Sequence, residues 1–268
     1  MSLSTTDHQN LGRSLYDAMR AETPIKPLTQ KHPTITIDDA YHISRVMLRH
    51  RLEADGERVV GKKIGVTSDA VQKMLGVFQP DFGFLTDAMA YANNAAIPIA
   101  GNLIAPRAEG EIAFRLNATL SGTNNTEQDV LAATDCVMPC FEIVDSRIEH
   151  WQIAIQDTIA DNASCGVYVL GDATLNPRDI DLANLRIDVT KNGTPLSSGM
   201  GSAVQGNPLT AVAWLANTLG AFGIDLEAGE VILSGSLVPL EPVQKGDEMT
   251  LIMSGEGVDS CSVHCRFT

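Results

Sequence analysis

Three glutamates in apolar, strand-forming surroundings constrain this chain more than any other feature. Glu109 and Glu111 stand one residue apart in segment 106–114, and Glu142 follows in a later Phe-Glu-Ile-Val run. Residues i and i+2 of a strand point to the same face, so Glu109 and Glu111 are expected side by side. Neighbouring carboxylates repel unless a cation or a shared proton lies between them. A solvated acidic edge strand and an all-oxygen site for Mg²⁺ or Mn²⁺ both fit this pattern.

Length and charge exclude several classes of function. A chain of 268 residues forms one large domain, or a small helical segment attached to a larger core. The net charge of −14 argues against sequence-independent nucleic-acid binding and against an anionic membrane surface. No run approaches the roughly 18 apolar residues of a membrane helix, and the N-terminal residues lack a signal-peptide pattern. We therefore expect a cytoplasmic protein.

The cysteines do not indicate a zinc site. The chain has five, an odd number that fits reduced thiols. Two pairs have three residues between their members, Cys136 with Cys140 and Cys261 with Cys265, and neither has the CxxC spacing of common zinc sites.

The pattern of the sequence changes near residue 59. Residues 1–58 are predicted to form an N-terminal helical segment, with Thr36 as the N-cap of a helix. Residues 59–268 contain short β-like runs separated by turn residues, and Asn192-Gly193 predicts a hairpin turn. Helices are expected at about 68–75, 127–134 and 209–222. Strands and helices do not alternate regularly, so we predict an α+β fold with a mixed, mostly antiparallel β-roll as its catalytic core.

Two lysines and an aspartate are further candidates for a site. Lys62 and Lys63 fall on opposite faces of a short predicted strand, so one points inward if the strand is half buried. An inward lysine could hold an anionic substrate or transfer protons. The pattern alone favours a simpler interpretation, a pair of surface lysines at a strand end. Asp81 is predicted in a Gln-Pro-Asp-Phe-Gly turn, where it either caps its own backbone or lines a pocket.

Two loops carry hydroxyl and small residues. Residues 156–165 change from polar to small before an apolar strand, and residues 233–239 form a Ser-Gly-Ser turn after another strand. Both segments suit close contact with a ligand, and both equally suit ordinary turn and capping contacts.

Taken together, these segments resemble the fumarylacetoacetate hydrolase superfamily, and within it the 2-hydroxypenta-2,4-dienoate (2-oxopent-4-enoate) hydratases of aromatic meta-cleavage pathways. The likeness runs over nearly the whole chain. The Glu-x-Glu…Glu arrangement is typical of the superfamily, while Gln-Pro-Asp-Phe-Gly and Gly-Glu-Ile-Ala-Phe point to the hydratase branch. The segments that carry the resemblance are residues 61–68, 75–83, 107–114, 141–147, 160–164 and 234–237.

The resemblance implies a β-rich roll that carries one Mg²⁺ or Mn²⁺ on Glu109, Glu111 and Glu142. It also implies that Lys63 and Asp81 lie in the same pocket, where they handle proton transfer and the positioning of water or of the substrate carboxylate. The metal would act as a Lewis acid on a 2-oxo acid and stabilise its enolate.

Ser164 and Ser236 are implied as hydrogen-bond donors to the substrate. The reaction implied is ketonisation of the dienol, which makes C4 electrophilic, followed by addition of water at C4 to give 4-hydroxy-2-oxopentanoate. The resemblance further implies a homo-oligomer, and it leaves open an association with a decarboxylase or an aldolase of the pathway.

Two other functions compete with this prediction. A 4-oxalocrotonate decarboxylase would use the same metal and the same enolate; Gly110, where decarboxylases tend to carry Pro, favours the hydratase. A non-catalytic subunit that stabilises a decarboxylase is a third interpretation, and Lys63 and Asp81 beside an intact set of carboxylates argue against it. A C–C bond hydrolase is disfavoured because no His/Glu pair for activating water is evident.

Overall fold

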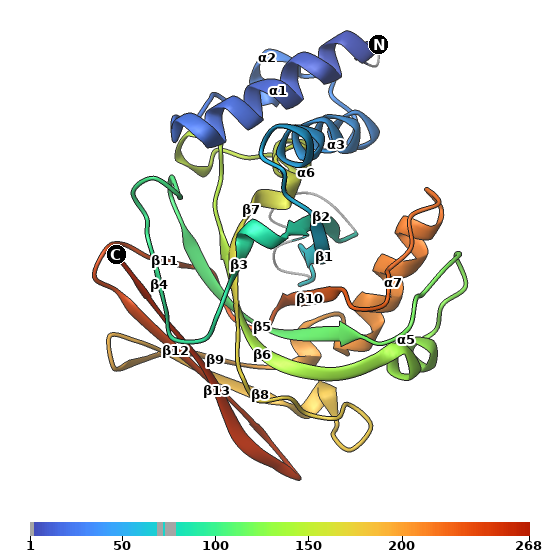
Figure 1. Ribbon diagram of the computed structural model, residues 1–268, viewed down its shortest axis with the longest axis vertical. Helices are drawn as coiled ribbons and strands as arrows, with labels where there is room; N and C mark the ends of the chain where they lie inside the picture. Colours follow the sequence, from blue (N-terminus) through green and yellow to red (C-terminus); the bar gives the residue numbers. More distant parts are fainter. Residues whose placement is uncertain (1–2, 69–71, 73–78) are drawn as a thin grey trace.

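The computed structural model describes residues 3–68, 72 and 79–268. Two curled β-sheets form the body of the molecule, and the N-terminal helices lie together at one end of it (Figure 1). The α+β fold with a mixed, mostly antiparallel core is confirmed. Within the described ranges, no helix combines the length and apolar character needed to cross a membrane.

The N-terminal helices begin where the sequence supplies caps. Thr36 accepts a hydrogen bond from the backbone of Asp39, and the Asp39 carboxylate accepts one from the backbone of Thr36, which confirms the predicted N-cap. The apolar sides of these helices pack on α6 (Ile155–Ala160) from the later part of the chain. The helices are α1 (Thr5–Ala21), α2 (Leu28–Lys31) and α3 (Ile37–Ala54).

The larger sheet has eight strands among the described residues, in the order β2-β1-β10-β5-β6-β7-β3, with β11 paired to β5. Within it, β1 pairs with β10 and β3 with β7 in parallel, and the other pairs are antiparallel. The strands are β1 (Val59–Gly65), β2 (Asp81–Thr86), β3 (Ala90–Tyr91), β5 (Arg107–Leu116), β6 (Thr134–Val144), β7 (Cys165–Leu170), β10 (Val231–Ser236) and β11 (Glu241–Pro242).

The smaller sheet has five strands in the described part of the chain, in the order β4-β13-β12-β8-β9. Asn192 and Gly193 both have positive φ at the turn between β8 and β9, so the predicted Asn-Gly hairpin is confirmed. The strands are β4 (Ala95–Ile97), β8 (Arg186–Lys191), β9 (Thr194–Met200), β12 (Glu248–Gly255) and β13 (Val258–Phe267).

The remaining helices are short, apart from α7. It begins at the N-cap Asn207 with Pro208 in its first turn, a position where proline removes no intrahelical hydrogen bond. The helices are α5 (Glu127–Ala133) and α7 (Pro208–Gly220), with 3₁₀ turns η1 (Asp87–Met89), η2 (Glu149–Trp151), η3 (Asn162–Ser164), η4 (Leu182–Asn184) and η5 (Gly201–Ala203).

Alternation along β5 separates a packing face from a polar face. Ile112 and Phe114 belong to the main apolar core, whereas Glu109 and Glu111 point to the other side. Gly110 lies where the smaller sheet packs: a Cβ there would come within 2.6 Å of Leu251 Cδ1. A larger residue at position 110 would thus have to displace the side-chain ends of Leu251 and Ile187.

Several local predictions were wrong. Residues 79–83 were predicted as a turn, but Asp81 begins strand β2. Lys62 and Lys63 are not surface residues, because each is only 3% exposed and each meets a carboxylate on its own side of β1. The helix expected at 68–75 lies mostly outside the described residues.

Candidate metal and catalytic site

Antiparallel pairing of β5 with β6 brings the three glutamates together. Glu109 and Glu142 are direct cross-strand partners, and Glu111 follows two residues along β5 on the same face. One carboxylate oxygen from each residue lies within 4.8 Å of the other two. All three side chains are buried, so the interpretation as a solvated acidic edge strand is wrong.

Several buried carboxylate oxygens of this cluster have no hydrogen-bond partner in the described part of the chain. Among the described residues, Glu111 Oε1 and both oxygens of Glu142 are buried without a hydrogen bond. The other oxygen of Glu111, Oε2, accepts a hydrogen bond of 2.8 Å from the backbone N–H of Gly235. Gly235 has a φ of 108°, and a Cβ there would lie 2.4 Å from Thr67 Cγ2. Glycine thus lets the end of β10 approach Glu111 and hold one oxygen while the other stays available.

Lys63 and Asp81 share the face of the larger sheet that carries the glutamates. Lys63 Nζ lies 3.2 Å from Glu142 Oε1, an ion pair without hydrogen-bond geometry. Gly65 pairs with Asp81 across β1 and β2, and a Cβ on Gly65 would lie 2.2 Å from Asp81 Oδ1 and 3.4 Å from Lys63 Nζ. The small residue therefore leaves room for both functional groups. Asp81 Oδ1 is itself buried without a hydrogen-bond partner in the described structure.

Burial and mutual repulsion perturb every carboxyl group here. Burial, followed by the charge of Glu142, raises the pKa of Glu109 to about 7, while Lys63 and the Ser236 hydroxyl act in the opposite sense. Burial and the other two glutamates raise the pKa of Glu111 well above its ordinary value. Burial also raises the pKa of Asp81 to about 6, against the effect of Lys63. A divalent cation among these oxygens would favour the ionised forms and lower these pKa values.

Lys63 remains a cation in this environment. Burial alone would lower the pKa of its ammonium group, but the surrounding acidic groups, Glu142 first, raise it above the ordinary value. With three glutamates and Asp81 on one side and a single ammonium on the other, the site has an excess of negative charge that suits a hard cation.

The two serines differ in their placement. Ser236 pairs in register with Glu111, and its hydroxyl donates to the carbonyl of Val238 at 2.6 Å. Ser164 lies in η3, where its hydroxyl is 3.0 Å from Thr158 Oγ1. The structure therefore brings Ser236 to the carboxylate cluster, and the hydroxyl of each serine already has a partner.

Sequence reasoning missed Asn162, which supports β2 from its free edge. The Asn162 side-chain amide donates to the carbonyl of Phe84 and accepts from its N–H, both at 2.9 Å, as a neighbouring strand would. Three consecutive non-glycine residues of this turn, Asn162, Ala163 and Ser164, have positive φ. The Asp-Asn-Ala-Ser run carried no local sequence signal for such a turn.

A buried ion pair anchors the same turn. The Arg147 side chain donates to Asp161 Oδ1 at 2.6 Å, to the Asp161 carbonyl and to the Cys165 carbonyl, and it is almost fully buried. These bonds fix the backbone on both sides of η3, and hence the position of Asn162 against β2.

Fold and site together define an α+β protein whose larger sheet carries a buried acidic cluster suited to a divalent cation. The chain belongs to the fumarylacetoacetate hydrolase family, because the model described as "Fumarylacetoacetate (FAA) hydrolase C-terminal" matches residues 60–263. This confirms the family that the motifs predicted.

The chain is similar to hydratases in sequence and to a decarboxylase in structure. A 2-hydroxyhexa-2,4-dienoate hydratase of Comamonas testosteroni is 60% identical over 94% of this chain and 95% of its own length. A 2-hydroxypent-2,4-dienoate hydratase of Pseudomonas putida is 61% identical over 80% of this chain and 96% of its own. Among solved structures, 4-oxalocrotonate decarboxylase from Pseudomonas putida G7, complexed with magnesium and adipate, has a TM-score of 0.93 at 34% identity and covers 99% of both chains.

Replacing Glu111 by Gln tests the electrostatic cost of the cluster. Glu111 has a raised pKa in the folded state, so its ionisation destabilises the fold as pH rises through that pKa. At pH 8 in EDTA, we expect the melting temperature of Glu111→Gln to exceed that of the unchanged protein by about 3 °C. Mg²⁺ should then raise the melting temperature of the unchanged protein much more than that of the variant. A lower melting temperature for the variant in EDTA would contradict the repulsion described above.

Replacing Arg147 by Met tests the anchor of the turn. Loss of one partner leaves Asp161 buried and unpaired, which should cost about 3–5 kcal/mol of unfolding free energy. Denaturant unfolding measures this value. The matched control is Arg186→Met, which removes an exposed ion pair with Asp188 and should leave the midpoint nearly unchanged. Equal effects of the two substitutions would show that the turn does not depend on Arg147.

Proposed function

We propose that this protein is a metal-dependent hydratase that converts 2-hydroxypenta-2,4-dienoate to 4-hydroxy-2-oxopentanoate in aromatic meta-cleavage catabolism. The observation that carries the proposal is the identity of 60–61% to two hydratases of 2-hydroxydienoates. The geometry agrees with it, because a lysine, an aspartate and three glutamates converge on one buried face.

In this proposal, Glu109, Glu111 and Glu142 hold one Mg²⁺ or Mn²⁺. The fit rests on their unpartnered oxygens and on the purely carboxylate donor set, which hard cations prefer. When bound, the cation supplies Lewis-acid stabilisation of the enolate of a 2-oxo acid. Calcium also occupies a structural relative, the decarboxylase complexed with calcium and acetate.

The environments of Lys63 and Asp81 suit these two residues to different roles. Lys63 stays protonated, so it donates hydrogen bonds to, and balances the charge of, an anionic substrate. Asp81 has a buried oxygen with no fixed partner, and its raised pKa places its proton exchange closer to neutral pH. We assign Asp81 to the proton transfer that moves the double bond into conjugation, and Lys63 to the substrate carboxylate. Ser236 and Ser164 are donors to the substrate in the same scheme, in which their hydroxyls exchange their present partners, the Val238 carbonyl and Thr158.

The decarboxylase is the second candidate function. The observation that favours it is the TM-score of 0.93 to 4-oxalocrotonate decarboxylase over nearly the whole chain. Gly110 does not separate the two reactions by itself, because it faces Leu251 of the smaller sheet, on the side of β5 opposite the glutamates. The higher identity to the hydratases favours hydration.

Three further parts of the proposal concern the whole protein. We propose a cytoplasmic location, a homo-oligomeric state and an association with a decarboxylase or an aldolase of the pathway. The similarity to a decarboxylase supports the association, whereas the location and the oligomeric state rest on the family resemblance.

Turnover with defined substrates tests the reaction. Purified protein with Mg²⁺ and fresh 2-hydroxypenta-2,4-dienoate should give a product heavier by one water, identified by mass and NMR. EDTA and the variant Glu142→Gln should each abolish it. Loss of CO₂ from 2-oxohex-3-enedioate, with the dienoate left unchanged, would establish the decarboxylase instead. If neither compound reacts, the interpretation as a non-catalytic partner subunit gains support.

Replacing Asp81 by Asn tests its role in proton transfer. The Asn side chain keeps the shape of Asp but cannot exchange a proton near neutral pH. We therefore expect kcat to fall by about 10²–10⁴-fold. Mg²⁺ affinity, measured by calorimetry, should change little because Asp81 is not among the proposed ligands. Lys63→Met is the contrasting variant, for which we expect a rise in KM as well. Full turnover by Asp81→Asn would remove Asp81 from the mechanism.

A further inference from the structure

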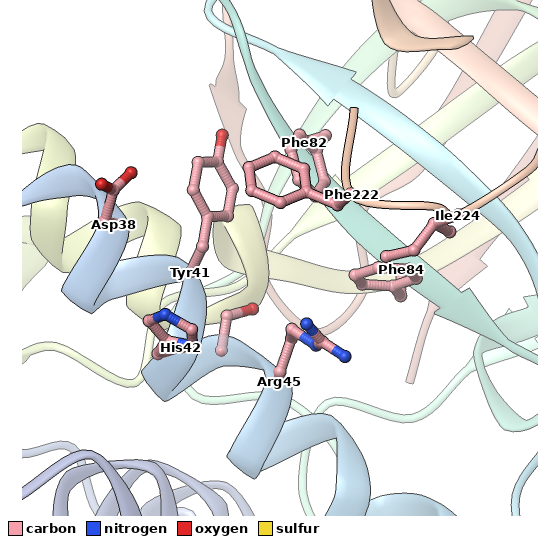
Figure 2. Close-up of a pocket in the computed structure, with 9 residues that line it drawn as sticks. Asp38, Tyr41, His42, Arg45, Phe82, Phe84, Phe222 and Ile224 are labelled. Carbon is pink, nitrogen blue, oxygen red and sulfur yellow. The ribbon is translucent and has the colours of Figure 1, made fainter. Parts of the chain in front are cut away.

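A second cavity lies behind β2, on the side opposite the carboxylates. Asp81 and Phe82 are adjacent in the strand, so their side chains point to opposite faces. The cavity measures about 170 Å³ and lies between α3, β2 and the segment that follows α7 (Figure 2). It is lined by Asp38, Tyr41, His42, Ser44, Arg45, Phe82, Phe84, Phe222 and Ile224. None of these residues belongs to the proposed catalytic site.

Aromatic rings form much of its wall. The Tyr41 and Phe82 rings stack with centroids 4.4 Å apart and an interplanar angle of 12°, and Phe84 meets Phe82 edge-on at 6.0 Å. Phe222 lines the same cavity but is 58% exposed, the most exposed large apolar side chain among the described residues. A planar aromatic guest would find both ring faces and ring edges to contact.

The helix side of the cavity carries a charge at each end. Asp38, Tyr41, His42 and Arg45 follow the i, i+3, i+4, i+7 spacing of one face of α3. Figure 2 shows Arg45 at the edge of the cavity on the side of Phe84, with Asp38 at the far end of the row. Arg45 is exposed and has no ion pair or hydrogen bond among the described residues. A free guanidinium beside apolar rings is suited to a carboxylate attached to a ring.

We propose that this cavity is a binding site for a small single-ring aromatic carboxylate. An apolar cavity of roughly 150 Å³ accommodates a benzene molecule, so the observed volume fits one substituted ring. The ring packs among Phe82, Phe84 and Phe222, and its carboxylate pairs with Arg45 at the rim. Ligand sites commonly have this composition, an apolar wall with a few polar groups that fix orientation.

The site shares no residue with the proposed catalytic site, although the charge of Asp81 acts on Tyr41 in its wall. It contains no candidate metal ligand, and β2 separates it from Lys63 and the glutamates. A bound aromatic acid therefore does not require the metal, which distinguishes this site from the carboxylate cluster.

Calorimetric titration of the full-length protein in EDTA with sodium benzoate tests the proposal. We expect saturable binding to one site per chain. Arg45→Gln should weaken benzoate binding about tenfold, the loss of one charge-assisted contact. Arg49→Gln is the matched control, since Arg49 is exposed one turn further along α3 and does not line the cavity. Benzyl alcohol, a neutral analogue, should bind more weakly and should not respond to Arg45→Gln. Phe222→Ser should also weaken the binding of benzoate.

Four results would overturn the proposal. In the first, benzoate binding does not saturate. In the second, benzoate binds the Arg45→Gln and Arg49→Gln variants equally well. Binding appears only when Mg²⁺ is added, which would place benzoate at the carboxylate cluster. Finally, Phe222→Ser changes the particle mass measured by light scattering while benzoate does not bind the unchanged protein, which would show that a second copy of the chain covers the cavity.

Discussion

Repulsion among three buried carboxylates is the constraint on which the rest of this structure depends. Glu109, Glu111 and Glu142 are brought together by the register of β5 and β6, and Lys63 is the one ammonium paired with them in the described structure. Burial of an unpaired charge is costly, so this arrangement persists only because the surrounding packing is strong. The apolar face of the same strands, with Ile112 and Phe114, supplies that packing by covering the smaller sheet. Strand β5 thus carries both the carboxylates that repel one another and the apolar side chains whose packing offsets that repulsion.

Sequence patterns revealed the glutamates because period-2 alternation is a local property. Glu109 and Glu111 share a face whatever the rest of the chain does, and a carboxylate within Phe-Glu-Ile-Val is unusual enough to notice. The caps at Thr36 and the Asn-Gly turn are likewise decided by neighbouring residues. The overall α+β fold followed from the irregular order of strands and helices together with the family resemblance, and it was confirmed.

What the sequence could not supply depends on distant contacts. Lys62 and Lys63 looked like a surface pair, yet both are buried and pair with Glu230, just before β10, and with Glu142 of β6. Asp81 looked like a turn residue, since its assignment to a strand depends on pairing with β1 and on the amide of Asn162. Neither partner is close in sequence, so no window of neighbouring residues contains the information. The roles of the two serines remain predictions for the same reason.

The strand order of the larger sheet also governs when the site can exist. The three glutamates face one another as soon as β5 pairs with β6, whereas Lys63, Asp81 and Gly235 join them only when β1, β2 and β10 have been added. The complete site therefore needs the chain from Lys63 to Gly235. Contacts of such long sequence separation form slowly, because loop closure has to precede them. A half-folded chain that contained only the β5–β6 pair would offer a cation the three carboxylates without Lys63 or Asp81 beside them. In a nascent chain the three carboxylates could therefore meet early, but the full set of site residues would be complete only after β10 has left the ribosome.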